Sequence, residues 1–159
     1  MMRSIGRSLE WGLWSLLICV AAAWGQEHPA SEANAVRAQV VVYRPGIHRD
    51  PKLLKPSVYY DDKEVALMYS GRYFTIAIPP GKHRISSSDE HSVVELDAKP
   101  GETYYVRIVV VNGAWIRNTF SVERRDASEA TKDLADLRPA DTSHIRAPDV
   151  VSVGTLPAK

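Results

Sequence analysis

The sequence predicts a mainly β protein, an antiparallel β-sandwich of about seven or eight strands with one short C-terminal helix. Short runs of alternating apolar residues recur between residues 38 and 122, and clusters of turn-forming residues separate them. Apolar residues at helical spacing recur instead in a short segment at residues 130–137. Many short strands separated by turns are typical of a sandwich or a barrel.

The first 25 residues have the pattern of a signal peptide. Arg3 and Arg7 precede an uncharged apolar run from Trp11 to Trp24, and Ala23 and Gly25 are small residues at the positions that signal peptidase reads. We expect cleavage after Gly25, with Ala23 as the second option, and export to the periplasm or the cell exterior. An uncleaved segment would instead tether the protein to the membrane, although the run is shorter than the ~20 residues of a typical span.

Charge and cysteine content limit the function classes. The chain has 20 basic and 19 acidic residues, so loss of Arg3, Arg7 and Glu10 leaves 18 of each and no net charge. Nucleic-acid-binding proteins typically have a clear basic excess, and we therefore expect no nucleic-acid partner. The single cysteine, Cys19, lies inside the apolar run, so cleavage would remove it and leave the mature chain with no disulfide and no thiol chemistry.

We divide the rest of the chain into a linker at residues 26–36, one β domain at residues 37–138 and a disordered tail at residues 139–159. The tail has two prolines and small residues but no sustained period. Strands are expected at the alternating apolar groups, which are Ala38 to Val42, Val58 and Tyr60, Val65 and Leu67, Phe74 to Ile78, Val94 and Leu96, Tyr104 to Val110, and Ile116 to Val122.

Turn residues predict how some of these strands connect. Directly opposed residues of a hairpin share one face of the sheet. A two-residue loop at Ser70-Gly71 would place the apolar Leu67 opposite Phe74, so we expect a hairpin there. Pro80-Gly81 and Pro100-Gly101 have the residues of type II turns, in which glycine takes a positive φ.

The last two strands require a loop with an odd number of residues around Asn112-Gly113. A two-residue loop would oppose Ile108 to Arg117 and would separate the apolar faces. An odd loop keeps these faces together, and one such register pairs Ile108 with Ile116.

A helix is expected after the last strand. Asp126 can cap its first turn, and Glu129 can reach back to complete a capping box. Ala130, Leu134 and Leu137 form one apolar stripe before Pro139. Since so short a helix is marginal alone, we expect its leucines to dock on the sheet or to cover an open sheet end.

Several of these segments together point to a known family. They are Val42-Tyr43-Arg44-Pro45, the strand, turn and strand at residues 56–65, Gly71-Arg72-Tyr73-Phe74, Pro80-Gly81-Lys82-His83 and residues 101–107. In this order they resemble a bacterial family of exported domains of unknown function, DUF2846, over about Arg37 to Arg138. More distantly, they resemble PEGA-type surface-layer modules. The resemblance implies a β-sandwich in an envelope or secreted location and implies no catalytic residues. We expect the immunoglobulin-like or transthyretin-like type of sandwich.

The sequence contains no recognisable catalytic, cofactor-binding or metal-binding pattern. The five histidines, His28, His48, His83, His91 and His144, do not have the spacing of metal ligands on one strand or helix. Residues 86–91 combine serine, aspartate and histidine, but without a Gly-x-Ser-x-Gly elbow they indicate a turn. A small hydrolase acting on envelope polymers through His83, His91 and nearby acids remains the alternative function.

Two surfaces are candidates for binding. The first is the outward side of the last hairpin, with Tyr105, Arg107, Trp115 and Arg117, because these residue types often anchor interfaces. Trp115 can equally pack under the helix or a loop. The second is the basic loop at residues 44–55, which suits an anionic glycan, a lipid headgroup or an acidic partner, or is simply solvated.

We therefore expect an exported, non-enzymatic binding or structural module of the bacterial cell envelope. Its expected partner is an envelope protein or a glycan. The membrane is expected to contact the protein only through an uncleaved N-terminal segment.

Overall fold

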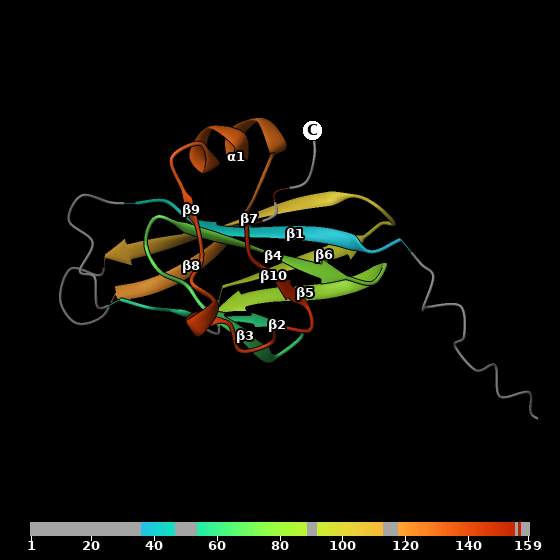
Figure 1. Ribbon diagram of the computed structural model, residues 1–159, viewed down its shortest axis with the longest axis horizontal. Helices are drawn as coiled ribbons and strands as arrows, with labels where there is room; N and C mark the ends of the chain where they lie inside the picture. The colour runs from blue at the N-terminus through green and yellow to red at the C-terminus, as the bar shows by residue number, and fades with distance from the viewer. Residues whose placement is uncertain (1–35, 47–53, 89–91, 113–117, 155, 157–159) are drawn as a thin grey trace, which may run out of the picture.

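The structure is a computed structural model, and it describes residues 36–46, 54–88, 92–112, 118–154 and 156. The expected signal peptide lies outside these residues, as does all of the expected linker except Val36. The described residues form two β-sheets with ten strands and one α-helix (Figure 1). The prediction of a mainly β chain with one short helix is therefore confirmed.

The larger sheet has the strand order β10-β4-β1-β7-β8, and β9 also pairs with β4. These strands are β1 (Ala38–Arg44), β4 (Arg72–Ile78), β7 (Thr103–Asn112), β8 (Asn118–Arg125), β9 (Arg138–Pro139) and β10 (Val151–Ser152). Strands β1 and β7 run parallel, as do β4 and β9. The expected purely antiparallel arrangement is thus wrong, because alternation of apolar residues is the same for either direction of pairing.

The smaller sheet is antiparallel throughout, with the order β3-β2-β5-β6. Its strands are β2 (Ser57–Tyr60), β3 (Lys63–Leu67), β5 (Gly81–Ser87) and β6 (Val93–Ala98). Asp61 and Asp62 join β2 to β3 with φ values of 44° and 65°. Two successive residues with positive φ suit the right-handed twist of a tight hairpin, and aspartate tolerates this conformation better than most residues.

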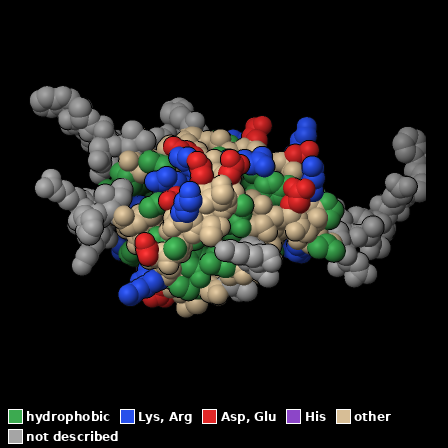
Figure 2. All heavy atoms as spheres, turned by 90° about the horizontal axis from the view of Figure 1, so that it is seen from above, with side chains coloured by type: hydrophobic (Ala, Val, Ile, Leu, Met, Phe, Trp, Pro, Cys, Tyr) green, Lys and Arg blue, Asp and Glu red, His purple; other side chains and the backbone are tan. Residues whose placement is uncertain are grey.

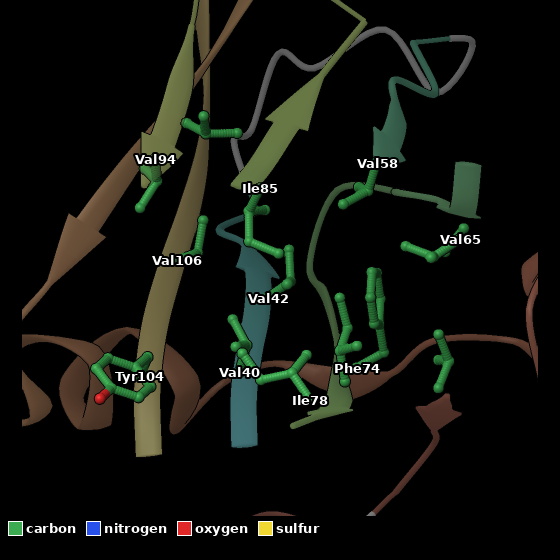
Figure 3. Packing of buried hydrophobic residues seen from close by; sticks show 14 of the residues in the cluster. Val40, Val42, Val58, Val65, Phe74, Ile78, Ile85, Val94, Tyr104 and Val106 are labelled. Atoms are coloured by element: carbon green, nitrogen blue, oxygen red, sulfur yellow. The ribbon is translucent and has the colours of Figure 1, made fainter. Parts of the chain in front are cut away.

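One hydrophobic core lies between the two sheets. Val40, Val42 and Phe74 come from the larger sheet, whereas Val58 and Ile85 come from the smaller one (Figure 3). All five are fully buried. The two sheets bury these apolar faces against one another, so both contribute to the main core.

The expected hairpin at Ser70-Gly71 is wrong. Leu67 ends β3 of the smaller sheet, whereas Phe74 lies in β4 of the larger sheet, so the chain crosses from one sheet to the other here. Gly71 has a φ of 70° at this crossing, and its amide donates to the Arg44 carbonyl at 3.0 Å. The alternation of apolar residues did not reveal the crossing. Leu67 and Phe74 can both point into the core from one sheet or from two sheets that face each other.

The hairpin of β7 and β8 has the predicted odd parity but a different register. Ile108 pairs with Val122, and Asn112 pairs with Asn118, so of the registers that an odd loop left open, the one with Ile108 opposite Ile116 does not form. This register places Arg107 opposite Glu123, whereas a three-residue loop would have placed it opposite Arg117, a pair of like charges. The connecting residues, including Gly113, lie outside the described part of the chain.

The expectation of a disordered tail is wrong for residues 140–152. The amide of Ala140 donates to the Tyr73 carbonyl at 2.7 Å, and that of Arg146 donates to Val65 at 2.8 Å. Val151 then pairs with Ile76 in β10. This strap runs along the β4 edge of one sheet and the β3 edge of the other. The buried residues of this strap do not recur with a helical or strand period. Single residues such as Ala147, which is 1% exposed, instead fill gaps at the edge of the core.

The helix α1 (Ala127–Leu134) begins after Asp126, as expected, but ends one turn earlier than expected. The predicted capping box is absent, because the Asp126 side chain makes no cap hydrogen bond. Glu129 instead lies 3.4 Å from Arg125, and Leu137 follows the helix as a partly buried residue. The helix docks on the outer face of the larger sheet, which confirms the docking prediction (Figure 1).

Candidate functional site

The outer face of the larger sheet carries a second apolar cluster, where α1 packs against the sheet. The fully buried Val41 and Tyr43 come from β1, and Ala130 and Leu134 come from α1. Alternation along β1 explains this arrangement. Residues 40 and 42 face the main core, and residues 41 and 43 therefore face the helix.

A polar contact joins the helix to the sheet at this cluster. The Tyr43 hydroxyl donates to Asp133 Oδ2 at 3.1 Å, and Arg107 Nη1 lies 3.6 Å from the same oxygen. Burial of Tyr43, and then the nearby charge of Asp133, raise the pKa of the phenol well above its ordinary value. The hydroxyl consequently keeps its proton and remains a donor to the carboxylate at neutral pH.

Further charges of both signs lie beside this contact. Arg125 pairs with Glu123 on its own strand and with Glu129 of α1. Figure 2 shows acidic and basic side chains interspersed on the face that carries the helix. Because opposite charges neighbour one another, the described side chains of this face do not form a strongly basic or acidic patch.

A groove of about 380 Å³ opens between α1 and the sheet. Most of its lining is apolar, and Leu156 is 40% exposed there. A volume of this size lies at the lower end of the range of about 300–1,000 Å³ that is usual for small-ligand pockets. The lining residues are Tyr73, Tyr105, Thr131, Leu134, Ala135, Leu137 and Leu156.

The structure brings two of the four candidate site residues to this surface. Tyr105 lines the groove as a partly buried residue, and Arg107 is paired with Asp133 at its margin. Trp115 and Arg117 lie outside the described residues. Sequence reasoning missed Tyr43 and Asp133. The available signal was a tyrosine on the helix-facing side of β1 and an aspartate beside the leucine stripe.

Comparison with protein families matches residues 34–120 to a family described as "Protein of unknown function (DUF2846)". The chain belongs to this family. No curated protein and no solved structure matches the chain. The more distant likeness to PEGA-type modules stays a prediction. The match covers β1 to β7 and the start of β8, so Tyr43 and Tyr105 lie inside it, whereas Asp133 and α1 lie beyond it.

The basic loop of this DUF2846 protein does not present Arg44 to solvent. Arg44 is 1% exposed, donates to the Leu54 carbonyl at 2.8 Å and lies over the Phe120 ring at 5.7 Å. Its inclusion in an exposed basic surface was therefore wrong. Lys55 lies over the Tyr69 ring, and His48, Arg49 and Lys52 lie outside the described residues.

His83 of the DUF2846 protein is held by three contacts near the start of β5. Its Nδ1 lies 2.7 Å from Asp61 Oδ2 and 3.1 Å from the Tyr60 hydroxyl, and its Nε2 lies 2.9 Å from the Pro79 carbonyl. Burial, and then the Asp61 charge, raise the pKa of Tyr60 to about 12. The His83 side chain is 10% exposed, and its contacts connect the β2–β3 turn to the backbone just before β5.

The serine-rich turn after β5 shows no catalytic arrangement in its described part. Ser88 Oγ accepts a hydrogen bond from the Ser57 amide at 2.7 Å, and residues 89–91, which include His91, lie outside the described part. Among the described residues, no three or more histidine, cysteine or acidic side chains gather as metal ligands would. No helix within the described part of the chain has the length and apolar character needed to cross a membrane.

Proposed function

We propose that this DUF2846 protein is an exported, non-enzymatic binding module of the bacterial cell envelope. The observation that supports this function best is the apolar groove between α1 and the larger sheet. Its tyrosine side chains are typical interface anchors, and its leucine side chains offer apolar surface to a segment of another envelope protein. The groove is flanked by the Arg107–Asp133 pair, so an apolar centre has a polar margin, as in other protein interfaces.

The alternative function, hydrolysis of envelope polymers through His83, has weaker support. A general base needs a ring nitrogen that can reach the proton it removes. Nε2 of His83 is bound to the Pro79 carbonyl, and Nδ1 faces Asp61 and Tyr60. Both nitrogens are therefore engaged within the protein, which favours a structural role.

We also propose an immunoglobulin-like or transthyretin-like sandwich as the finer fold type. The supporting feature is Tyr104 at the corner where the chain passes from β6 to β7. Its hydroxyl accepts from the Lys99 amide at 3.0 Å and lies 3.0 Å from the Asp97 carbonyl. A tyrosine that bonds the backbone at a corner between sheets is a recurrent feature of immunoglobulin domains.

Export rests on the N-terminal sequence, so its test is direct. We expect Edman sequencing of the protein purified from its native cells to begin at Gln26, and fractionation to place it outside the cytoplasm. A chain that keeps Met1 in the membrane fraction would support the tethered alternative. A full-length chain in the cytoplasm would overturn the export proposal.

The binding function is tested by photo-cross-linking from the groove. We expect a benzoylphenylalanine at position 137 to cross-link a discrete envelope protein, whereas one at the exposed Lys132 of α1 does not. That protein, once purified, should bind the wild type saturably and bind Tyr105→Ala at least about fivefold more weakly, as truncation of an interface anchor predicts. Equal cross-linking from both positions, or equal binding by the variant, would overturn the proposal.

A further inference from the structure

The outer face of the smaller sheet is a second, chemically different surface. In the described part of the chain no helix or strand covers this face, and α1 lies on the opposite side of the molecule (Figure 1). Lys82 and Arg84 of β5 are exposed there, as are Glu95 and Asp97 of β6. We call this surface the β5–β6 face.

Two hollows adjoin on the β5–β6 face. One, of about 440 Å³, has Tyr59, Ser86 and Val93 among its lining residues. The other, of about 410 Å³, is lined in part by Lys82 and the acidic residues of β6. Arg84 lines both, so the hollows adjoin at this side chain, and together their lining spans β2, β5 and β6. Such an extent suits a chain better than a compact ligand.

The charged residues of β5 and β6 face one another in pairs of opposite sign. Lys82 lies directly opposite Asp97, and Arg84 lies directly opposite Glu95. Among the described residues neither pair closes to an ion pair, and Arg84 instead lies 3.4 Å from Asp62. Asp61 and Asp62 also line the hollows, so the carboxylates there outnumber the cations of Lys82 and Arg84 and oppose a polyanion. Cations and carboxylates side by side supply fixed donors and acceptors, which suits an uncharged ligand whose hydroxyl groups both donate and accept hydrogen bonds.

A platform with one aromatic and one aliphatic side chain completes the site at one end. Tyr59, Ser86 and Val93 lie in one row across β2, β5 and β6. The tyrosine ring and the valine methyl groups offer a surface to the C–H face of a sugar ring, and the serine hydroxyl lies between them. Hydroxyl groups along the rest of a sugar chain would reach the charged pairs, which supply fixed donors and acceptors.

We propose that the β5–β6 face binds an uncharged polysaccharide chain. This site is independent of the groove at α1, because the core separates the two sheets, and the protein would thus join a glycan on one face to a protein on the other. Lys82, Arg84, Glu95 and Asp97 bond the sugar hydroxyls, and Tyr59 and Val93 pack against one sugar ring.

The test is a titration of the ¹⁵N-labelled mature protein with neutral hexasaccharides, namely cellohexaose, maltohexaose and N-acetylchitohexaose. We expect at least one to shift the amides of β5 and β6 saturably. Its affinity should stay the same between about 50 and about 300 mM NaCl, because an uncharged ligand releases no counterions. Hexagalacturonate, which is anionic, should bind more weakly, and a chitosan hexamer, which is cationic, should bind no more tightly. Absence of saturable shifts with all three neutral chains, or tighter binding of a charged one, would overturn the proposal.

Matched variants separate this site from the groove. We expect Arg84→Ala to weaken glycan binding by about tenfold, because Arg84 lines both hollows and its backbone bond to Asp61 is kept. Tyr59→Ala provides a second test at the platform, with the melting temperature as a check on folding. Tyr105→Ala should leave glycan binding unchanged while it weakens binding at the groove. Equal loss from Tyr105→Ala, or no loss from either face variant, would contradict the assignment.

Discussion

The Tyr43 hydroxyl bonds the Asp133 carboxylate at 3.1 Å, across ninety positions of the sequence. This contact ties the first strand to α1 and also brings Asp133 within 3.6 Å of Arg107. Because the family match ends at residue 120, the strand supplies a residue from the matched region and the helix supplies one from beyond it. The geometry of the groove therefore depends on a segment that the family match does not include.

Replacement of Tyr43 by phenylalanine tests this contact. The variant loses one hydrogen bond to a charged group, but Asp133 is 30% exposed and can bind water instead. We expect the free energy of unfolding in urea to fall by about 1 kcal/mol. Tyr105→Phe is the matched control, since no described residue bonds its hydroxyl, and should change stability by less than about 0.5 kcal/mol. Equal losses would show that the hydrogen bond does not stabilise the docked helix.

A pH dependence follows from Asp61. Burial alone would raise its pKa, but hydrogen bonds from His83 and from the Arg84 amide outweigh burial and hold the pKa below 3.8. A carboxyl whose pKa is lower in the folded state stabilises the fold above the unfolded-state pKa, and this contribution is lost as the pH falls through the folded-state value. We expect the stability of the wild type to fall between about pH 5 and pH 2.

Asp61→Asn provides the control for this pH dependence, because asparagine also tolerates the φ of 44° at this position. At pH 7 the variant should lose less than about 1 kcal/mol, because the carboxylate is partly exposed and solvent screens its contact with His83. The difference between variant and wild type should then shrink toward pH 2. A constant difference in urea denaturation across this range would contradict the assignment.

The local rules of strands and helices explain what the sequence predicted well. Ile108 and Phe120 can share one face of the sheet only if the loop between β7 and β8 has an odd number of residues, and the register of the structure meets this condition. The spacing of Ala130 and Leu134 located the helix and its buried stripe. Such patterns depend on residues that are near one another in sequence, so they needed no knowledge of the three-dimensional fold.

The errors arose where pairing depends on distant segments. Leu67 and Phe74 would both point toward the core whether their strands pair in one sheet or lie in two sheets that face each other. The direction of β1 relative to β7 has no local signature either. The candidate site shows the same limit, because residue type pointed to Tyr105 and Arg107, whereas the contact of Tyr43 with Asp133 became visible only when the helix was placed on the sheet.

The strap at residues 140–152 should contribute to stability. Ala147 and Val151 are almost fully buried, and the strap bonds the edges of both sheets. We expect a chain that ends at Pro139 to lose about 2 to 4 kcal/mol of unfolding free energy. The bared edges of β3 and β4 should also promote self-association in light scattering. A chain that ends at Gly154 is the control, and equal stability of the two truncated proteins would show that the strap does not stabilise the fold.

Gly101 should be the most sensitive position of the turn between β6 and β7. Its φ of 74° suits the third residue of a type II turn, which the Glu102 amide closes by donating to the Lys99 carbonyl at 3.2 Å. A Cβ there would lie 3.5 Å from a Val36 methyl group, which is ordinary contact, so the cost of Gly101→Ala should come from φ alone. We expect a loss of about 1 to 2 kcal/mol in urea denaturation, and a smaller loss for Gly101→Asn, because asparagine adopts left-handed conformations more readily than alanine. Since Tyr104 bonds the backbone of the same turn, its ring signals in NMR spectra should change in the alanine variant. An equal loss for both variants would indicate crowding by Cβ in place of backbone strain.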